Sequence, residues 1–150
     1  MTGWHIKYKE LIKEKCKELT LKYLLEGNQE KSKLKRLKYY QLSMQSYLTS
    51  TNISTRQKKH LFRFRTRMAN VGDNYGRKGT CPLCFIGHDD QEHLFKCIMI
   101  NLNNEDLYKN IEVKYEDVFS MNDDKLIKIA RLCDSIIRTR EKLIATKQSQ

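Results

Sequence analysis

The sequence predicts a mainly α protein, in which a small helical domain is interrupted by irregular loops. Three observations predict this fold class. Apolar residues recur at helical spacing in several stretches, only one proline and six glycines occur among 150 residues, and a Cys/His-rich segment, CPLCFIGHDDQEHLFKC, occupies residues 81–97. With 39% hydrophobic and 31% charged residues, the composition is that of a globular chain with one sizeable core.

Three segments are expected along the chain. Residues 1–53 form an N-terminal basic helical segment, residues 54–102 hold a basic helix and the Cys/His-rich segment, and residues 103–150 supply C-terminal helices that pack on the same core. In the first segment, an amphipathic helix is predicted from His5 to Glu26, and Gly27-Asn28 is a stop signal. Residues 30–48 follow a less regular apolar pattern that permits a break.

The middle segment begins with the residues STRQ, which are typical of a capping box. The Ser54 side chain can accept a hydrogen bond from the backbone three residues on, while Gln57 reaches back, so a helix is predicted from Thr55 to about Ala69. One side of this helix is apolar, whereas most of its cations point elsewhere. The residues VGDNYGRKG that follow are punctuated by glycines and are expected to form a loop.

The last segment contains the helix with the clearest sequence pattern. Asn122 or Asp123 is expected to cap a helix that continues to about residue 147 and carries one apolar face. Before it, Asn103 or Asn104 can cap a short helix through Tyr108, and residues 109–120 are expected to hold an extended segment.

The positive charge of the chain is concentrated in its first half. The net charge is +11, and residues 54–78 carry eight Lys/Arg against the single Asp73, whereas residues 89–124 carry ten Asp/Glu against three Lys. Such a distribution is typical of a polyanion-binding protein. Two alternatives stay open: the lysines and arginines form a solvated helical surface, or some of them pair with the acidic segment.

The Cys/His-rich segment has the spacing of a metal site, Cys81-x2-Cys84-x8-His93-x3-Cys97. Two thiolates two residues apart on a tight turn can ligate one tetrahedral ion. His93 and Cys97 are four residues apart and share one side of a helix, for which Asp89 or Asp90 is a natural cap. Because soft thiolates with one imidazole favour Zn²⁺, we expect a CCHC zinc knuckle embedded in the helical domain.

The zinc is expected to be structural, and the protein is not expected to be an enzyme. A hydrolytic zinc keeps a coordination position for water, whereas four protein ligands with three thiolates close the shell. His88 is a competing ligand because it lies in the intervening loop, but it has no helical partner at the right spacing. The remaining thiols, Cys16 and Cys133, are expected to be small buried hydrophobic residues, and an odd number of cysteines argues against a disulfide framework.

A longer block, residues 60–97, resembles the region after the polymerase domain in the reverse transcriptases of non-LTR (LINE-like) retrotransposons. The match comprises a basic helix, an Asn/Tyr loop and the knuckle, and its residues are Arg63, Arg65, Thr66, Arg67, Asn74, Tyr75, Cys81, Pro82, Cys84, Glu92, His93, Leu94 and Cys97. Weaker similarity extends over residues 35–145. No aromatic-x-Asp-Asp motif of a polymerase palm occurs, so the resemblance implies a zinc-binding C-terminal region detached from the polymerase domain.

The leading hypothesis is therefore a zinc-stabilised, non-catalytic module that binds RNA or DNA mainly through phosphates. The candidate contacts are the cations and one aromatic residue around the basic helix and the following loop: Lys58, Lys59, Arg63, Arg65, Arg67, Tyr75, Arg77 and Lys78. Tyr75 and Phe85 are candidates for stacking on unpaired bases, with packing inside the fold as the alternative role.

The rival hypothesis is a zinc-stabilised scaffold for protein interaction or homodimerisation through the helices at residues 5–26 or 122–146. Neither hypothesis involves a membrane, since no apolar run approaches the length of a membrane span. The start MTGWHIKYKE also lacks the apolar stretch of a signal peptide, so an intracellular location, nuclear or cytoplasmic, is expected.

Overall fold

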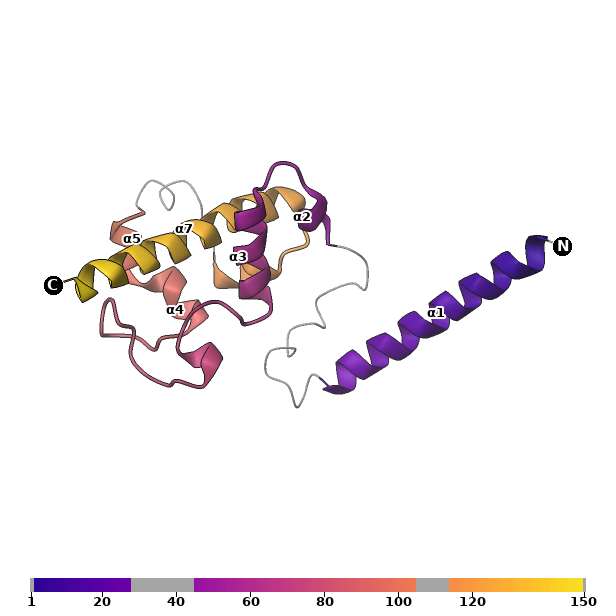
Figure 1. Ribbon diagram of the computed structural model, residues 1–150, viewed down its shortest axis with the longest axis horizontal. Helices are drawn as coiled ribbons and strands as arrows, with labels where there is room; N and C mark the ends of the chain where they lie inside the picture. The colour runs from indigo at the N-terminus through magenta and orange to yellow at the C-terminus, as the bar shows by residue number, and fades with distance from the viewer. Residues whose placement is uncertain (1, 28–44, 105–113, 150) are drawn as a thin grey trace. The chain divides into compact units, whose positions relative to one another are not determined.

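The computed structural model describes residues 2–27, 45–104 and 114–149, and the side chains of the first helix from residue 7 to residue 22. The chain divides into two compact units, Met1–Gln45 and Ser46–Gln150. The division falls at residue 45, eight positions before the expected end of the N-terminal segment at residue 53, because Tyr47 and Ile53 are buried in the core of the second unit. The mainly α fold is confirmed (Figure 1).

The first unit contains helix α1, Thr2–Gly27, which ends at the predicted stop signal. All of its described side chains are exposed, including Tyr8, Leu11, Ile12 and Leu19. Cys16 is exposed as well, so the expectation that this thiol is buried is wrong. Apolar side chains at helical spacing do not by themselves bury a helix face, since burial also requires a partner surface.

The second unit begins with the short helix α2, Ser46–Thr49, and continues into α3, Thr55–Arg65. The predicted capping box is confirmed: the Ser54 hydroxyl accepts from the Gln57 N–H, and the Gln57 side chain accepts from the Ser54 N–H. The helix ends at Arg65 and not near Ala69, because Arg67 adopts a left-handed conformation with φ 54°.

Several short helices lie between α3 and the last helix in the described residues, and three of them come before residue 105. These three are the 3-10 helix η2, Asp73–Tyr75, and helices α4, Gln91–Lys96, and α5, Ile98–Leu102. Another 3-10 helix, η3, Tyr115–Phe119, lies in the described part of residues 109–120. The expectation of an extended segment is therefore wrong there. Asn103 is the C-terminal cap of α5, and the helix predicted from it through Tyr108 lies mostly outside the described residues.

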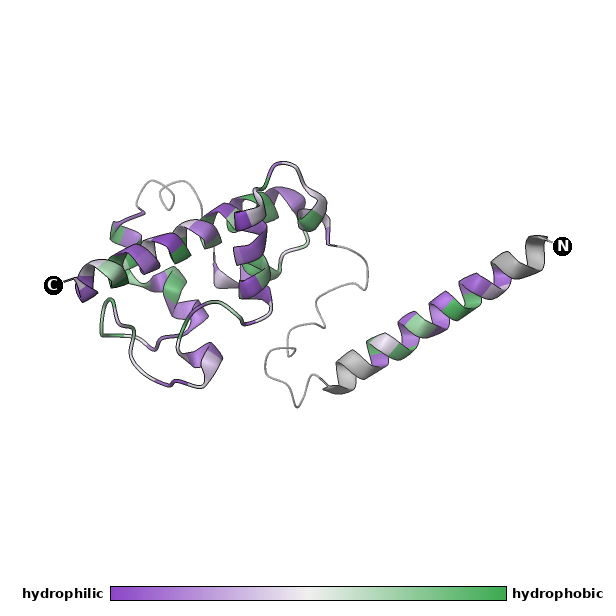
Figure 2. Cartoon of the chain, in the orientation of Figure 1, coloured by the Kyte–Doolittle hydropathy of each residue, from purple (hydrophilic) through white to green (hydrophobic). Residues whose placement is uncertain are grey.

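Helix α7, Asp123–Gln148, runs along the second unit, and α3 packs across it (Figure 1). Asn122 caps it, as predicted, by accepting from the Lys125 N–H. Its core-facing residues include Ile129, Cys133 and Ile136, each with no exposed surface, which confirms the expected burial of Cys133. Hydrophobic and hydrophilic residues alternate along α3 and α7, as expected for helices buried on one side (Figure 2).

The core of this unit joins α3, α4, η3 and α7. Leu61 and Phe64 of α3, Leu94 of α4 and Val118 of η3 are fully buried. The rings of Phe64, Phe95, Tyr115 and Phe119 follow one another in edge-to-face contacts with centroids 5.5, 5.7 and 6.0 Å apart. Since burying one such side chain stabilises a fold by roughly 1.5–3 kcal/mol, this aromatic cluster contributes strongly to the packing of α3, α4 and η3.

Candidate metal centre

The first two candidate ligands lie on a closed loop. Thr80 and His88 form an isolated antiparallel bridge, and the Cys81 N–H donates to the Gly87 carbonyl at 2.7 Å. Inside this loop, the Phe85 N–H donates to the Cys81 carbonyl at 3.0 Å and closes the tight turn on which Cys81 and Cys84 stand. The predicted knuckle turn is therefore present.

The other two candidate ligands come from helix α4. Asp90 caps this helix by accepting from the His93 N–H at 2.7 Å, which confirms the predicted role for one of the paired aspartates. Cys97 ends α4 and begins α5. The four-residue spacing therefore presents His93 and Cys97 on one side of the helix, toward the knuckle turn.

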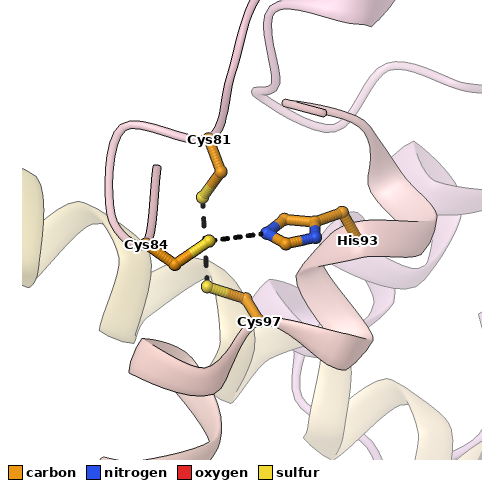
Figure 3. Close-up of side chains that lie close together, drawn as sticks. All are labelled: Cys81, Cys84, His93 and Cys97. Atoms are coloured by element: carbon orange, nitrogen blue, oxygen red, sulfur yellow. Dashed lines mark hydrogen bonds between the residues drawn. The ribbon is translucent and has the colours of Figure 1, made fainter. Parts of the chain in front are cut away.

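The four side chains converge on one point (Figure 3). All four ligand atoms lie within 4.8 Å of one another, with Cys81 Sγ 3.9 Å from Cys97 Sγ and Cys84 Sγ 3.2 Å from His93 Nε2. A tetrahedral ion with metal–sulfur bonds of about 2.3 Å would place its sulfur ligands about 3.8 Å apart. The cluster can thus hold a metal ion, and its donor set is compatible with zinc.

The environment of the thiols differs between the two halves of the cluster. Burial by itself would raise the pKa of Cys84, but hydrogen bonds from the backbone N–H groups of Gly87 and Ile86, among others, lower this pKa to about 6. Burial dominates at Cys97 and raises the pKa of its thiol to about 11. The backbone N–H groups that follow Cys84 therefore stabilise its thiolate, which is the form that binds a metal.

His88, the competing ligand, does not belong to the cluster. Its side chain is exposed, and its backbone pairs with Thr80. The neighbouring Gly87 explains why His93 takes this place. A Cβ added at Gly87 would lie 2.2 Å from His93 Nδ1, so only a glycine allows the imidazole to approach the loop this closely.

One candidate nucleic-acid contact, Arg65, is not at the surface. Arg65 is 2% exposed, and its guanidinium donates to the carbonyl oxygens of Val118 and Ser120. The guanidinium also lies 4.8 Å from the centre of the Tyr47 ring. The prediction that Arg65 binds phosphates is therefore wrong for this conformation. Its position four residues after the buried Leu61 was the signal for a core-facing role.

The remaining cations of the basic helix differ in their availability. Lys58 donates to the Leu48 carbonyl at 3.0 Å, and Arg67 pairs with Asp73 at 3.1 Å. Lys59 is exposed and Arg63 is half-buried, and within the described residues neither forms an ion pair.

The loop after the basic helix exposes three further candidates, Tyr75, Arg77 and Lys78. Tyr75 is 51% exposed, and its hydroxyl donates to the Met68 carbonyl. Phe85, at the tip of the knuckle, is 68% exposed, and the Lys147 ammonium lies 4.4 Å from the centre of its ring. Phe85 therefore contacts α7 through Lys147.

Two polar residues, Gln91 and Asp89, position this loop, a role that the sequence pattern did not predict for either. The Gln91 side chain bonds to Ala69, Asn74, Phe64 and Tyr115. Asp89 accepts from the Gly72 N–H at 2.7 Å and pairs with Arg140 of α7 at 2.8 Å. The sequence predicted Asp89 only as an alternative cap of α4, and its pairing partner Arg140 could not be identified because it is 51 residues away.

Among the helices described, none combines the length and the apolar character that a membrane span requires. Searches of protein-family models, of curated proteins and of solved structures each find no match to this chain.

Proposed function

We propose that this protein is a zinc-stabilised, non-catalytic module that binds RNA or single-stranded or structured DNA through phosphate contacts. The observation that carries the proposal is a set of cations close in sequence to the metal cluster: Lys59, Arg63, Arg77 and Lys78. None of them forms an ion pair within the part of the chain that the structure describes. Cations without carboxylate partners are available to replace the counterions of a polyanion.

The proposed metal is Zn²⁺, held by Cys81, Cys84, His93 and Cys97. A zinc ion with this donor set supplies folding free energy and cross-links the knuckle turn to α4. It is proposed to do no chemistry, since four protein ligands leave no position for a water molecule.

The assignment to nucleic acid, rather than to acidic protein partners, also draws on the sequence resemblance to the reverse transcriptases of non-LTR retrotransposons. In this proposal Lys59 and Arg63, four residues apart on α3, contact successive phosphates. Tyr75, a residue that is half exposed, stacks on an unpaired base.

The test is binding of the zinc-loaded chain to single-stranded RNA, duplex RNA and duplex DNA over a salt series. Replacing Lys59 and Arg63 by alanine should reduce the slope of log K against log salt by roughly 1.4–1.8, as expected for the loss of two phosphate contacts. Lys128→Ala/Arg131→Ala, which removes the same two side-chain types from the exposed side of α7, is the matched control.

Two results would contradict the proposal: affinity that does not change with salt, or equal losses in the α3 variant and its control. The second result would show that only net charge matters.

A second candidate function is protein interaction through α1, favoured by one observation. Tyr8 and Leu11 of this helix are each 66% exposed, and Leu19 is 56% exposed. A protein contact with an apolar centre would persist at high salt, so the same salt series separates the two candidates.

A further inference from the structure

A pocket of about 540 Å³ lies where the loop of residues 70–80 and the residue Asp89 meet the second half of α7. Its wall combines the cations Arg77, Lys78 and Arg140 with the apolar side chains of Ile137 and Ile144. This volume is within the range of small-ligand sites, about 300–1,000 Å³. The pocket adjoins the base of the knuckle, since Gly79 and Thr80 also line it.

The buried cation of this pocket is incompletely paired. Arg140 is 5% exposed, and its Nη2 lies 2.8 Å from Asp89 Oδ1 and 3.0 Å from Asp89 Oδ2. Its other terminal nitrogen, Nη1, is buried and has no hydrogen-bond partner among the described residues. Asp89 Oδ1 in the same ion pair has no such partner either, so the pair leaves one buried donor and one buried acceptor unsatisfied. Since a buried N–H group without an acceptor is costly, Nη1 would gain from an acceptor that a ligand brings.

The charges around the pocket favour an anion. Three cations, Arg77, Lys78 and Arg140, line it together with two carboxylates, Asp89 and Glu141, so its formal charge is 3 − 2 = +1. Asp89 Oδ2 accepts from Arg140 and from the Gly72 N–H, and Oδ1 lies 2.8 Å from Arg140 Nη2 without a hydrogen bond. Arg77 and Lys78 are exposed and have no ion-pair partner in the described residues, so both can turn toward a ligand.

The loop that carries these cations is held in one shape. The Arg77 N–H donates to the Gly72 carbonyl at 2.9 Å, and a Cβ added at Gly72 would lie 2.6 Å from the Arg77 carbonyl oxygen. The Asp89 N–H donates to the Gly79 carbonyl at 3.0 Å, and this hydrogen bond joins the same loop to the segment that leads into α4. The pocket wall is therefore largely formed before any ligand binds.

We propose that this pocket binds a phosphate group carried by a nucleotide unit, with Arg140 Nη1 donating from the buried wall and Arg77 and Lys78 closing from the rim. The guanidinium fork suits a phosphate oxygen, and the apolar side chains beside it exclude water and strengthen the contact. The pocket is larger than a phosphate alone and has room for the attached sugar. The choice of phosphate over other oxyanions rests on the proposed function.

The test uses the full zinc-loaded chain and four probes: inorganic phosphate, uridine 5′-monophosphate, acetate, and a short RNA with either a 5′-phosphate or a 5′-hydroxyl. Binding is followed at matched ionic strength by the ¹H–¹⁵N resonances of Gly72, Arg77, Lys78 and Gly79 and of the Arg140 side chain. We expect saturable shifts with phosphate and with the nucleotide, and none with acetate. A preference for the 5′-phosphorylated RNA would show that the pocket takes the phosphate of a strand end. Equal binding of both RNAs would show that it takes an internal phosphodiester.

Two variants test the residues. Arg77→Ala/Lys78→Ala alters only exposed side chains and should weaken nucleotide binding at least roughly tenfold, because charge-assisted hydrogen bonds are lost. Arg140→Lys keeps the charge but removes Nη1, and should abolish the shift of the pocket resonances while the far side of α7 is unaffected. Lys128→Ala/Arg131→Ala is the matched control and should bind as the unmodified chain does.

The proposal is overturned if phosphate gives no saturable shifts, if acetate binds equally, or if the Arg77/Lys78 variant binds as its control does. Its failure is distinguishable from failure of the proposed function. Salt-dependent RNA binding without any phosphate site overturns the pocket alone. Saturable nucleotide binding without RNA binding supports the pocket and rejects the nucleic-acid function.

Discussion

Gly87 shows how one residue of the knuckle determines whether the imidazole can join the three thiols. Its carbonyl accepts from the Cys81 N–H, and its α-carbon faces the ring of His93. A Cβ at this position would lie 2.2 Å from Nδ1 and 2.4 Å from Cε1 of that ring. Because both the loop backbone and the start of α4 are held by hydrogen bonds, neither side can easily give way.

Gly87→Ala should therefore displace His93 and weaken metal binding by roughly 10–100-fold, the usual range for residues that orient a ligand. Competition with a chromophoric chelator measures the affinity, and the absorption of the Co²⁺-substituted protein reports whether one nitrogen ligand is lost.

Gly79→Ala is the matched control, since an added Cβ there has no atom within 4 Å and neither glycine has a positive φ. Equal metal affinity in the two variants would contradict the role assigned to Gly87.

At the scale of elements, α3 and α7 meet at a buried carboxylate surrounded by cations. Asp134 of α7 is 4% exposed and accepts two hydrogen bonds from Arg56, at 2.8 and 3.1 Å. His60 of α3 lies 3.7 Å from the same carboxylate. Burial lowers the pKa of His60, and the attraction of Asp134 offsets this only in part. The other charged groups that act on His60 are Arg63, Glu141 and Lys59.

This lowered pKa predicts a pH dependence of stability. As the pH falls below 6.5, the unfolded chain protonates His60 more readily than the folded chain does, so the free energy of unfolding decreases. Between about pH 7 and about pH 5, the free energy of unfolding should decrease less in His60→Gln than in the unmodified chain. The difference between the two decreases should be at most roughly 1.4 kcal/mol for each pH unit. Urea unfolding at several pH values measures this difference.

His88→Gln, at an exposed histidine, is the control and should keep the original pH slope. Parallel stability curves for His60→Gln and the unmodified chain would show that burial does not shift this group.

At the scale of the whole molecule, the cluster of Cys81, Cys84, His93 and Cys97 is part of the core of the second unit and not an appendage. Cys81 and Cys97 have no exposed surface and belong to the same cluster of buried residues as Leu94, Val118 and Ile136. Lys147, near the end of α7, donates to the carbonyl oxygens of Pro82 and Leu83 at 3.0 Å each. Loss of the metal should therefore loosen the packing of α7 as well as the knuckle.

Complete chelation should lower the thermal midpoint of the protein by at least about 10 °C, since a loss of about 2 kcal/mol shifts a domain of this size by that amount. Calorimetry, with elemental analysis of the metal content, checks this outcome. Cys97→Ser should behave like the chelated protein, whereas Cys16→Ser, at an exposed thiol outside the cluster, should bind metal normally. An unchanged midpoint after full metal removal would contradict the four-ligand assignment.

Local patterns predicted the features that depend on neighbouring residues. The capping box at Ser54, the cap at Asn122 and the ligand spacing of residues 81–97 all act within a few residues, so their geometry can be derived from the backbone of a turn or a helix. The end of α3 and the helical form of Tyr115–Phe119 could not be derived in this way. In both places, packing against α7 and α4 competes with weak local preferences.

By itself, the sequence determined a mainly helical fold, four residues able to hold a metal and an excess of positive charge near them. Only the tertiary structure decided which of the charged residues remain at the surface. Arg65 is buried against Val118, Arg67 pairs with Asp73, and Arg140 meets Asp89 across the fold. The physical reason is that a charged side chain pairs with whichever partner the fold brings near it, and such partners lie up to 78 residues away in the chain, as Asp134 does from Arg56.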